Sequence, residues 1–341
     1  MKTLPQPVRR GTLMRYDVTT LGELVIDLVP TRTPEGLAYL PKPGGAPANV
    51  AAGMARLGHP AAMITKVGNE AFGTAAVSAL EAAGVAIDAV IRAPAHNTAL
   101  AVVTQTASGE TDFFFYRENC ADANLTPGEV PTDLIAASKI LHIGTLLLAS
   151  PISAAAQRHA ITCARSKGVL VSADLNFRLA FWRDPERMRA AGLEVVRAAS
   201  IVKVSRDELS LLAGTGDTEA AVRSLWDEGM IAFAVTRGVD GADLFTENAG
   251  VSVPGFPVAV VDTVGCGDAF MASLLSGLIE SRFQLQADSL RLLALRACAA
   301  GALVATRSGA LETMPSRAEI DAFLRERLNS RGPTPEEGVA G

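Results

Sequence analysis

The chain of 341 residues has few of the features that mark secreted, metal-stabilised or membrane proteins. It holds only 4 cysteines, with no CxxC pair and no Cys/His cluster, so we expect neither a structural zinc site nor a disulfide framework. No apolar run reaches the ~20 residues of a transmembrane helix. The N-terminal segment also lacks the apolar stretch of a signal peptide. These absences predict a cytoplasmic protein without a membrane partner.

Positive charge does not predominate in this chain. The 31 Lys and Arg residues are outnumbered by 36 Asp and Glu residues, which gives a formal net charge of −5. A nucleic-acid partner calls for a basic surface, so we expect none. Small anionic ligands stay compatible, because they need only a few local cations. Hydrophobic residues make up 49% of the chain, enough for a full core in one large domain or two small ones.

Strand-like and helix-like segments alternate along most of the chain. Short apolar runs, typical of strands buried on both faces, are separated by helical stretches and lie at 140–143, 169–173, 201–204 and 232–236. Repeated strand–helix alternation predicts an α/β fold: a Rossmann-like, doubly wound and mostly parallel sheet with helices on both sides.

One region breaks this alternation. Residues 99–106 and 111–117 are rich in β-formers and are separated by a short polar turn, which predicts a hairpin. A hairpin does not fit the crossover pattern of a parallel sheet. We therefore place it in a small separate sheet built from segments at about 24–43 and 97–120. The expected organisation is a main domain at 16–328, with disordered segments at 1–15 and 329–341.

The segment VDTVGCGDAF, at 261–270, carries the clearest chemical signal. Gly265, Cys266 and Gly267 place small residues where a loop turns into an apolar helix. Backbone N–H groups without partners and the helix dipole would form an anion hole there. Asp268 follows in the first turn, and the residues alone leave its role open. It is either a carboxylate that stabilises the helix N-terminus or a base for a hydroxyl that attacks a phosphoryl group.

A second segment, PGGAPANVAAGMARL at 43–57, gives a weaker signal by itself. Gly44 and Gly45 permit positive φ or a close backbone approach, and Asn49 lies one turn into the following helix. A helix N-terminus with one tolerated polar residue explains this pattern as well as a binding site does.

Together the two segments resemble the diagnostic motifs of the ribokinase-like sugar kinases, the PfkB family. GGAPANVA and DTVGCGDAF occur in the family's order and separation, and several pieces around and between them agree: GELVIDLVP, FYRENCAD, DLNFR, VKVSRDE, VTRGVDG and TRSGA. The resemblance covers roughly residues 16–328. It implies a Rossmann-like core with a small β-sheet lid. It also implies an ATP-dependent kinase that uses Mg²⁺ to phosphorylate a primary hydroxyl of a small sugar.

The same resemblance assigns roles to individual residues. Asp268 matches the general base that activates the acceptor hydroxyl. The matches to the anion hole are Gly265, Cys266 and Gly267. The matches to sugar-binding positions are Asp27, Gly44, Gly45 and Asn49, together with Arg117, which resembles a lid residue that reaches over the substrate.

The DLNFR segment follows a buried strand, at the edge where open α/β sheets bind ligands. A solvated strand end with a salt bridge would explain it structurally. The resemblance instead places Asn176 near the metal and phosphates, and Arg178 near the substrate or the transferred phosphoryl group. A cation there would offset charge that builds on the equatorial oxygens.

Further segments match the nucleotide and ion sites of the family. Ser205 and Glu208 form a capping box, which is a complete structural explanation. The resemblance adds that Glu208 organises Mg²⁺ through water, while Ser205 stands where the family usually has Asn. The other matches to nucleotide-binding positions are Lys203, Thr236, Gly238 and Gly241. Asp262 and Ser308 match a monovalent-cation site, with K⁺ as the expected ion.

Substrate identity is less sharply indicated. The combined motifs look most like those of fructokinases, so fructose is the first expectation. The alternative is 2-keto-3-deoxygluconate, whose carboxylate would need Arg117 or Arg178 as a partner. Ribose or a nucleoside follows, and a non-catalytic sugar-sensing protein on the same fold is the most remote alternative.

Two smaller expectations concern assembly and thiol chemistry. We expect a homodimer through the lid, with Phe113 and Phe115 supplying an apolar patch unless they pack under the lid itself. Cys266 stands where relatives commonly have Ala. A thiol at a helix N-terminus is expected to have a lowered pKa, and so to be sensitive to alkylation and protected by ATP.

Overall fold

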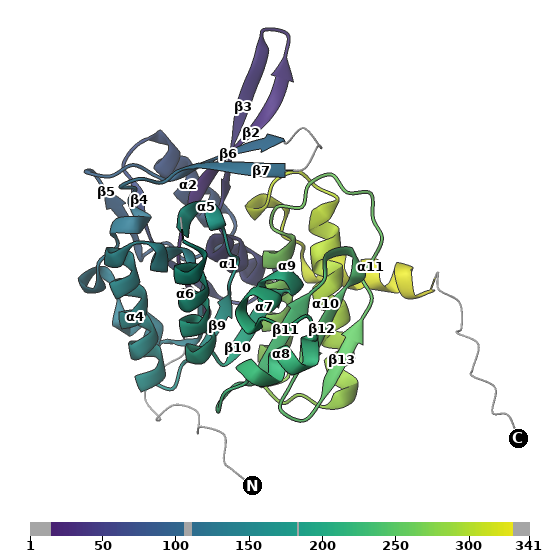
Figure 1. Ribbon diagram of the computed structural model, residues 1–341. Helices are drawn as coiled ribbons and strands as arrows, with labels where there is room; N and C mark the ends of the chain where they lie inside the picture. The colour runs from purple at the N-terminus through teal and green to yellow at the C-terminus, as the bar shows by residue number, and fades with distance from the viewer. Residues whose placement is uncertain (1–14, 106–110, 183, 330–341) are drawn as a thin grey trace, which may run out of the picture.

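Two β-sheets organise the molecule (Figure 1). The computed structural model describes residues 15–105, 111–182 and 184–329; the extensions expected at 1–15 and 329–341 lie outside these residues except for residues 15 and 329. In spatial order, the larger sheet contains β13 (Gly250–Val253), β12 (Ala242–Phe245), β11 (Ala232–Thr236), β10 (Ile201–Ser205), β9 (Leu170–Asp174), β8 (Ser138–Ile143), β1 (Tyr16–Leu21), β4 (Ala61–Gly68) and β5 (Val90–Ala93).

The larger sheet is mostly parallel. From β5 across to β11 every pair of neighbouring strands runs parallel, and an antiparallel hairpin of β12 and β13 completes one edge. The expected runs at 140–143, 169–173, 201–204 and 232–236 correspond to β8, β9, β10 and β11. The expectation of a doubly wound, mostly parallel sheet is confirmed.

Core packing explains why these strands are continuously apolar. Along β8, Ile140 packs into the core on one face of the sheet and Leu141 into the core on the other. Ile201 and Val202 of β10 divide in the same way. Because side chains alternate between faces, a strand covered on both sides needs apolar residues at every position.

Helices cover both faces of the larger sheet. Those that contribute to the first core are α1 (Ala46–Arg56), α2 (Ala71–Ala82), α9 (Cys266–Glu280), α10 (Ala287–Ala305) and α11 (Arg317–Asn329). Those on the opposite face are α3 (Thr132–Ala136), α4 (Pro151–Ser166), α6 (Pro185–Ala198), α7 (Arg206–Ala213) and α8 (Thr218–Leu225). Within the described ranges, no helix is both long and apolar enough to cross a membrane.

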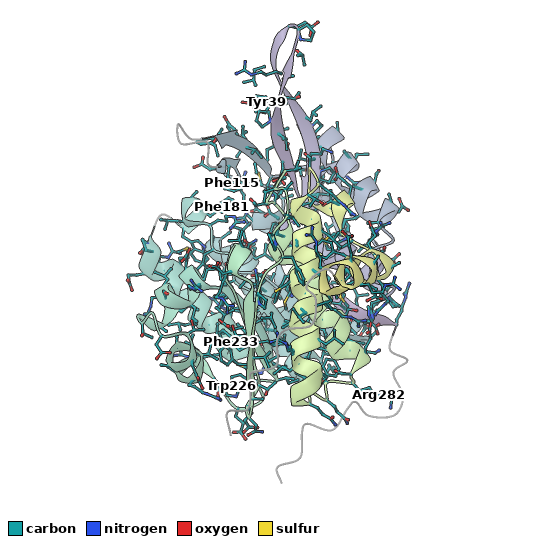
Figure 2. All side chains as sticks on the ribbon, turned by 90° about the vertical axis from the view of Figure 1, so that its right-hand side faces the viewer. Tyr39, Phe115, Phe181, Trp226, Phe233 and Arg282 are labelled. Atoms are coloured by element: carbon teal, nitrogen blue, oxygen red, sulfur yellow. The ribbon has the colours of Figure 1, made fainter. Side chains whose placement is uncertain are left out.

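The smaller sheet contains the segments that sequence placed outside the parallel core. Its order is β3 (Gly36–Gly44), β2 (Val25–Thr33), β6 (Leu100–Gln105) and β7 (Thr111–Tyr116). Two antiparallel hairpins, β2–β3 and β6–β7, join through a parallel pairing of β2 with β6. This sheet lies across one end of the larger one, and the β2–β3 hairpin projects beyond the body (Figures 1 and 2). We refer to these four strands as the lid.

Candidate active site

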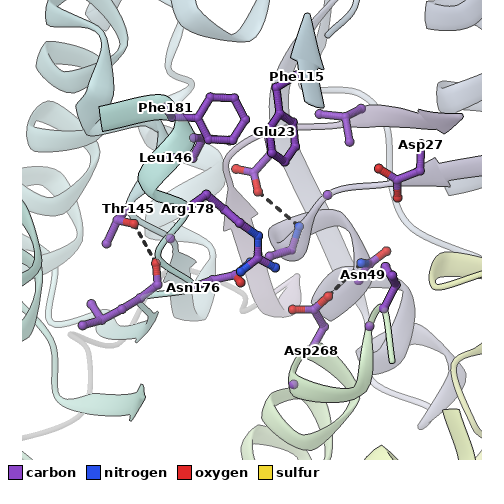
Figure 3. A pocket seen from close by; sticks show the side chains of 18 of the residues that line it. Glu23, Asp27, Asn49, Phe115, Thr145, Leu146, Asn176, Arg178, Phe181 and Asp268 are labelled. Carbon is purple, nitrogen blue, oxygen red and sulfur yellow. Dashed lines mark hydrogen bonds between the residues drawn. The ribbon is translucent and has the colours of Figure 1, made fainter. Parts of the chain in front are cut away.

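A pocket lies between the lid and the carboxyl ends of the central strands (Figure 3). Segments from many parts of the chain meet there: the β1–β2 connection, the start of α1, the residues after β8 and β9, the short helix α5 (Leu179–Trp182), and the start of α9. Its lining residues include Asp27, Gly45, Asn49, Asn176, Arg178, Lys203, Gly265, Gly267 and Asp268, all of them sequence candidates. Ligands of open α/β sheets bind at this edge.

Asp268 occupies the first turn of α9 and is buried, with 7% of its surface exposed. Its Oδ2 accepts a hydrogen bond from Asn49 Nδ2 of α1 at 2.7 Å. Burial raises the pKa of Asp268, while the Asn49 hydrogen bond and the positive charges of Lys203 and Arg178 oppose that rise. A buried carboxyl with a raised pKa is suited to exchange a proton with a ligand.

The N-terminus of α9 is shaped for an anion. Gly265 adopts the left-handed conformation at φ +83° and provides no side-chain cap. A Cβ at Gly267 would lie 2.7 Å from the Nζ of Lys203, so the missing side chain keeps an ammonium group close to this helix end. Backbone N–H groups, the helix dipole and a lysine charge therefore meet at one place, which suits a phosphoryl oxygen.

Lys203 belongs to a buried ion pair at the ends of β9 and β10. Its Nζ lies 3.1 Å and 2.9 Å from the two carboxylate oxygens of Asp174. Burial disfavours the lysine charge, but the carboxylates of Asp174 and Glu208 outweigh this and raise the pKa of Lys203. Lys203 therefore stays protonated beside the helix end.

The DLNFR segment turns sharply after β9. Asn176 has a positive φ of 43°, a conformation that Asn tolerates better than most residues. The hydroxyl of Thr145 donates to the carbonyl of Leu175 at 2.6 Å and fixes this turn. Arg178 then extends into the pocket (Figure 3), where its charge opposes the rise that burial causes in the pKa of Asp27 and of Asp268.

Glycines bring the lid close to α1. A Cβ at Gly44 would lie 2.5 Å from Oδ2 of Asp27 on the paired strand, and Gly45 has φ +115°, which strongly favours glycine. Burial raises the pKa of Asp27 to about 7. The negative charges of Asp262 and Asp268 add to this rise, and Arg178 opposes it. Asp27 and Asp268 thus supply two carboxyls to the same pocket.

Arg117 does not line the pocket. Its Nε donates to Oδ2 of Asp122 at 2.7 Å, and both side chains are buried, with 8% and 2% exposed. The guanidinium also lies 5.5 Å from the centroid of the Phe181 ring. The structure therefore places Arg117 in a buried ion pair behind the pocket wall.

Cys266 requires a correction. It is partly buried at the start of α9, and burial raises the pKa of its thiol to about 12, with the charges of Asp268 and Asp262 adding to the effect. The expectation of a lowered pKa from the helix N-terminus is wrong, because desolvation and two nearby carboxylates outweigh the dipole.

Ser205 and Glu208 form the expected capping box at α7. Oε2 of Glu208 accepts from the Ser205 N–H at 2.7 Å, and Oε1 accepts from the Phe177 N–H at 2.6 Å. Both oxygens of Glu208 therefore have backbone partners. Within the described parts of the chain, no cluster of three or more His, Cys, Asp or Glu residues could hold a metal directly.

The other nucleotide and ion candidates are not among the residues that line the pocket. Thr236 ends β11, and Gly238 and Gly241 have positive φ in the turn to β12. The carboxylate of Asp262 accepts from the Val264 N–H at 3.0 Å and from the N–H of Gly309, the residue after Ser308, at 3.2 Å. It therefore joins the loop before α9 to the loop after α10.

Glu23 and Phe115 line the pocket and were not identified as site residues from sequence. Phe115 of β7 packs against Phe181 with ring centroids 4.1 Å apart, under the lid rather than on its outer face (Figures 2 and 3). The side chain of Phe113 lies outside the described ones. The sequence does contain a signal for Glu23: it is a charged residue between two apolar runs, two residues after the first strand ends.

Comparisons with known proteins agree with this geometry. A family model described as pfkB family carbohydrate kinase matches residues 16–317. A fructokinase-2 of Solanum habrochaites is 38% identical over 316 residues, which cover 90% of this chain and 96% of the relative.

Two solved structures are similar in fold. One is a fructokinase from Vibrio cholerae O395 in a form with bound fructose, ADP and calcium ion, at TM-score 0.79 and 31% identity, covering 91% of this chain and 99% of that one. The other is a putative ribokinase II from E. coli in complex with ATP and Mg²⁺, at TM-score 0.81 and 30% identity, with coverages of 91% and 99%.

Proposed function

Because this chain belongs to the pfkB family of carbohydrate kinases, we propose that it transfers the γ-phosphoryl group of ATP to a primary hydroxyl of fructose. The observation that carries the proposal is the buried carboxyl of Asp268 in the first turn of α9, inside the pocket beneath the lid. The fructokinase relative and the fructose-bound V. cholerae protein support fructose as the acceptor.

Asp268 acts as the general base. Asn49 holds its Oδ2 and leaves the other carboxylate oxygen to accept the proton of the acceptor hydroxyl. Because the group is buried, its pKa is raised toward the range in which a carboxylate takes up a proton efficiently. The lid and the aromatic pair of Phe115 and Phe181 keep water from the attacking position.

The start of α9 receives the transferred phosphoryl group. The N–H groups that follow Gly265, the partly buried turn at Cys266 and the open space at Gly267 form the anion hole, with Lys203 adding a positive charge. Arg178 lies on the other side of Asp268 and offsets charge on the equatorial oxygens. Asp27, Gly44, Gly45 and Asn49 bind the hydroxyls of the sugar.

ATP and Mg²⁺ fit the residues present. Asn176, Lys203, Ser205, Thr236, Gly238 and Gly241 lie along the nucleotide side of the sheet edge. Mg²⁺, carried by the phosphates, neutralises their charge. Glu208, whose two oxygens are held by the N–H groups of Phe177 and Ser205, would orient water molecules around that ion. The E. coli structure in complex with ATP and Mg²⁺ supports ATP as the phosphoryl donor and Mg²⁺ as its ion.

We also propose that K⁺ activates the enzyme. Asp262 joins the two loops that flank the start of α9, and Ser308 lies in the second of these loops. A monovalent cation bound there would order the anion hole. Rates in potassium, sodium and bulky organic-cation buffers test this, and equal rates in all three would remove K⁺ from the mechanism.

An ATP-consumption screen over fructose, 2-keto-3-deoxygluconate, ribose, adenosine and tagatose tests the proposed function. Fructose should give the highest kcat/KM. Turnover of 2-keto-3-deoxygluconate instead would favour a sugar-acid kinase. Sugar binding without turnover of any substrate would favour the sugar-sensing alternative.

The outer face of the lid supports a homodimer. Its exposed apolar side chains are Leu37, Tyr39, Phe114 and Tyr116, which the strand register puts on one face and which are between 41% and 66% exposed. Tyr39 lies on the projecting hairpin (Figure 2). A second copy would cover this face and the edge strands with it. Sedimentation of the Tyr39→Asp/Phe114→Asp double variant should show monomers where the parent protein shows dimers.

A further inference from the structure

Glu23 lies at the end of the pocket beside Phe115, apart from Asp268 (Figure 3). It belongs to the segment that crosses from β1 to β2, and only 7% of its surface is exposed. Gly22 before it packs tightly on α1, since a Cβ at Gly22 would lie 2.3 Å from Cγ of Pro47. The backbone that carries Glu23 is therefore held in place.

The carboxyl of Glu23 accepts two backbone hydrogen bonds, from the N–H of Glu23 itself and from the N–H of Ala46. Oε1 accepts the N–H of Ala46 at 3.2 Å, at the N-terminus of α1, where Gly45 provides no side-chain cap. Figure 3 shows the other oxygen turned away from this bond, toward the side of the pocket with Phe181 and Leu146. Capping α1 therefore occupies Oε1, and the other oxygen faces the pocket, where a ligand can reach it.

Negative charge predominates at this end of the pocket. The charges that act on Glu23 are those of Arg117 and Asp122, and Arg117 is already paired with Asp122. Two carboxyls thus share one guanidinium. Arg178, the other arginine considered for a substrate carboxylate, acts on Asp27 and Asp268.

We infer that Glu23 selects the acceptor by the group that lies farthest from the reacting hydroxyl: it accepts a hydrogen bond from a neutral hydroxyl and repels a carboxylate. The inference rests on the proposed function, since Asp268 defines which end of the sugar reacts. Fructose carries hydroxyl groups at its remote end, whereas 2-keto-3-deoxygluconate carries a carboxylate. Two carboxylates among aromatic and aliphatic side chains repel strongly. Glu23 is thus a specificity residue that favours neutral ketoses over sugar acids.

The ionisation of Glu23 sets the assay conditions. Burial raises its pKa to about 7; Arg117 opposes this rise and Asp122 adds to it. At pH 8 the group is mostly a carboxylate, so the repulsion is best measured there.

The test uses 3-deoxyfructose and 2-keto-3-deoxygluconate, two substrates that differ only at C1, which is a hydroxymethyl group in one and a carboxylate in the other. The parent enzyme at pH 8 should prefer the neutral sugar. Glu23→Gln keeps an oxygen for the Ala46 N–H but removes the charge. It should lower the ratio of the two kcat/KM values about 10- to 100-fold.

Glu70→Gln is the matched control. Glu70 caps α2 by accepting the Gly73 N–H at 3.2 Å and does not line the pocket. Its variant should leave the substrate ratio unchanged. An unchanged ratio in Glu23→Gln, with fructose still phosphorylated, would overturn the inference and leave the proposed function standing.

Measurements on the parent enzyme keep the inference falsifiable if Glu23→Gln does not fold. Equal use of the two sugars by the parent enzyme would overturn the inference alone. Preference of the parent enzyme for the sugar acid would overturn both the inference and the assignment of fructose.

Discussion

The side-chain amide of Asn49 donates to Oδ2 of Asp268 at 2.7 Å, across 219 residues of sequence. Asn49 is in α1 and Asp268 is in the first turn of α9, and both side chains are buried. The bond joins the two sequence motifs into one site. Because the donor is a neutral amide, the bond orients the carboxylate without neutralising its charge. The carboxylate can therefore still accept a proton.

Replacement of Asp268 by Asn should abolish most turnover. The amide oxygen can still accept from Asn49, so the fold and the sugar site are retained while the base is lost. We expect kcat to fall about 10²- to 10⁴-fold, with dissociation constants for ATP and fructose by calorimetry within a few-fold of the parent values. Near-normal kcat in a variant that binds both ligands would rule out Asp268 as the base.

Replacement of Asn49 by Ala should shift the pH profile. The Asn49 hydrogen bond stabilises the ionised form of Asp268, so its loss raises the pKa of that carboxyl further above its usual value. A base works in its deprotonated form, and activity is lost as pH falls through its pKa. The acidic limb of kcat/KM against pH should therefore move to higher pH, with part of the lost activity recovered above pH 8. A parallel loss at every pH would contradict this role.

The main sheet was predictable because its determinants are local. The runs that became β8, β9, β10 and β11 are apolar at every position, since each strand packs on both faces. The hairpin of β6 and β7 was recognisable from its polar turn, although that turn at 106–110 lies outside the described residues. The antiparallel edge of β12 and β13 was missed, because such short strands carry little periodic signal.

Site residues that belong to a short sequence motif could be predicted. Residues whose role depends on contacts formed only in the folded chain were harder to predict. Asp268, Gly265 and Asn49 belong to compact motifs and meet in one pocket. Arg117 looked like a substrate ligand, yet a partner five residues along, Asp122, pairs with it. Glu23 was overlooked because its significance depends on α1, which approaches it only in the folded chain.

Replacement of Gly265 by Ala should weaken both stability and activity. Gly265 has φ +83°, and a Cβ would lie 2.8 Å from Cβ of Ala310, so the substitution combines backbone strain with a clash. We expect a loss of about 1–3 kcal/mol in the free energy of unfolding, and a fall in kcat because the anion hole moves. Gly214 is the control: it has φ +69° with nothing within 4 Å of an added Cβ. Gly214→Ala should cost about 1–2 kcal/mol without a change in kcat.

Thiol alkylation of the folded protein should be slow. Burial raises the pKa of Cys120 to about 11 and those of Cys266 and Cys298 to about 12. Burial also raises the pKa of Cys163. Iodoacetamide reacts with thiolates, so at pH 8 mass spectrometry should find little modification. In denaturant all four thiols should react rapidly. Rapid ATP-protected modification of Cys266 in the native enzyme would contradict the raised pKa.

Replacement of Lys203 by Met should destabilise the fold, because it leaves the carboxyl of Asp174 buried without its ammonium partner. We expect a loss of up to about 3–5 kcal/mol in the free energy of unfolding, which develops above pH 7. The folded-state pKa of Asp174 is already raised by burial to about 7 and rises further without Lys203. The parent protein already bears the cost of a raised pKa up to about pH 7, so the additional cost in the variant is small below pH 7 and grows as pH rises above it. Urea unfolding at several pH values checks this. The Lys203→Met/Asp174→Asn double variant should recover much of the stability while nucleotide affinity stays low; recovery of both would show that Lys203 serves only the fold.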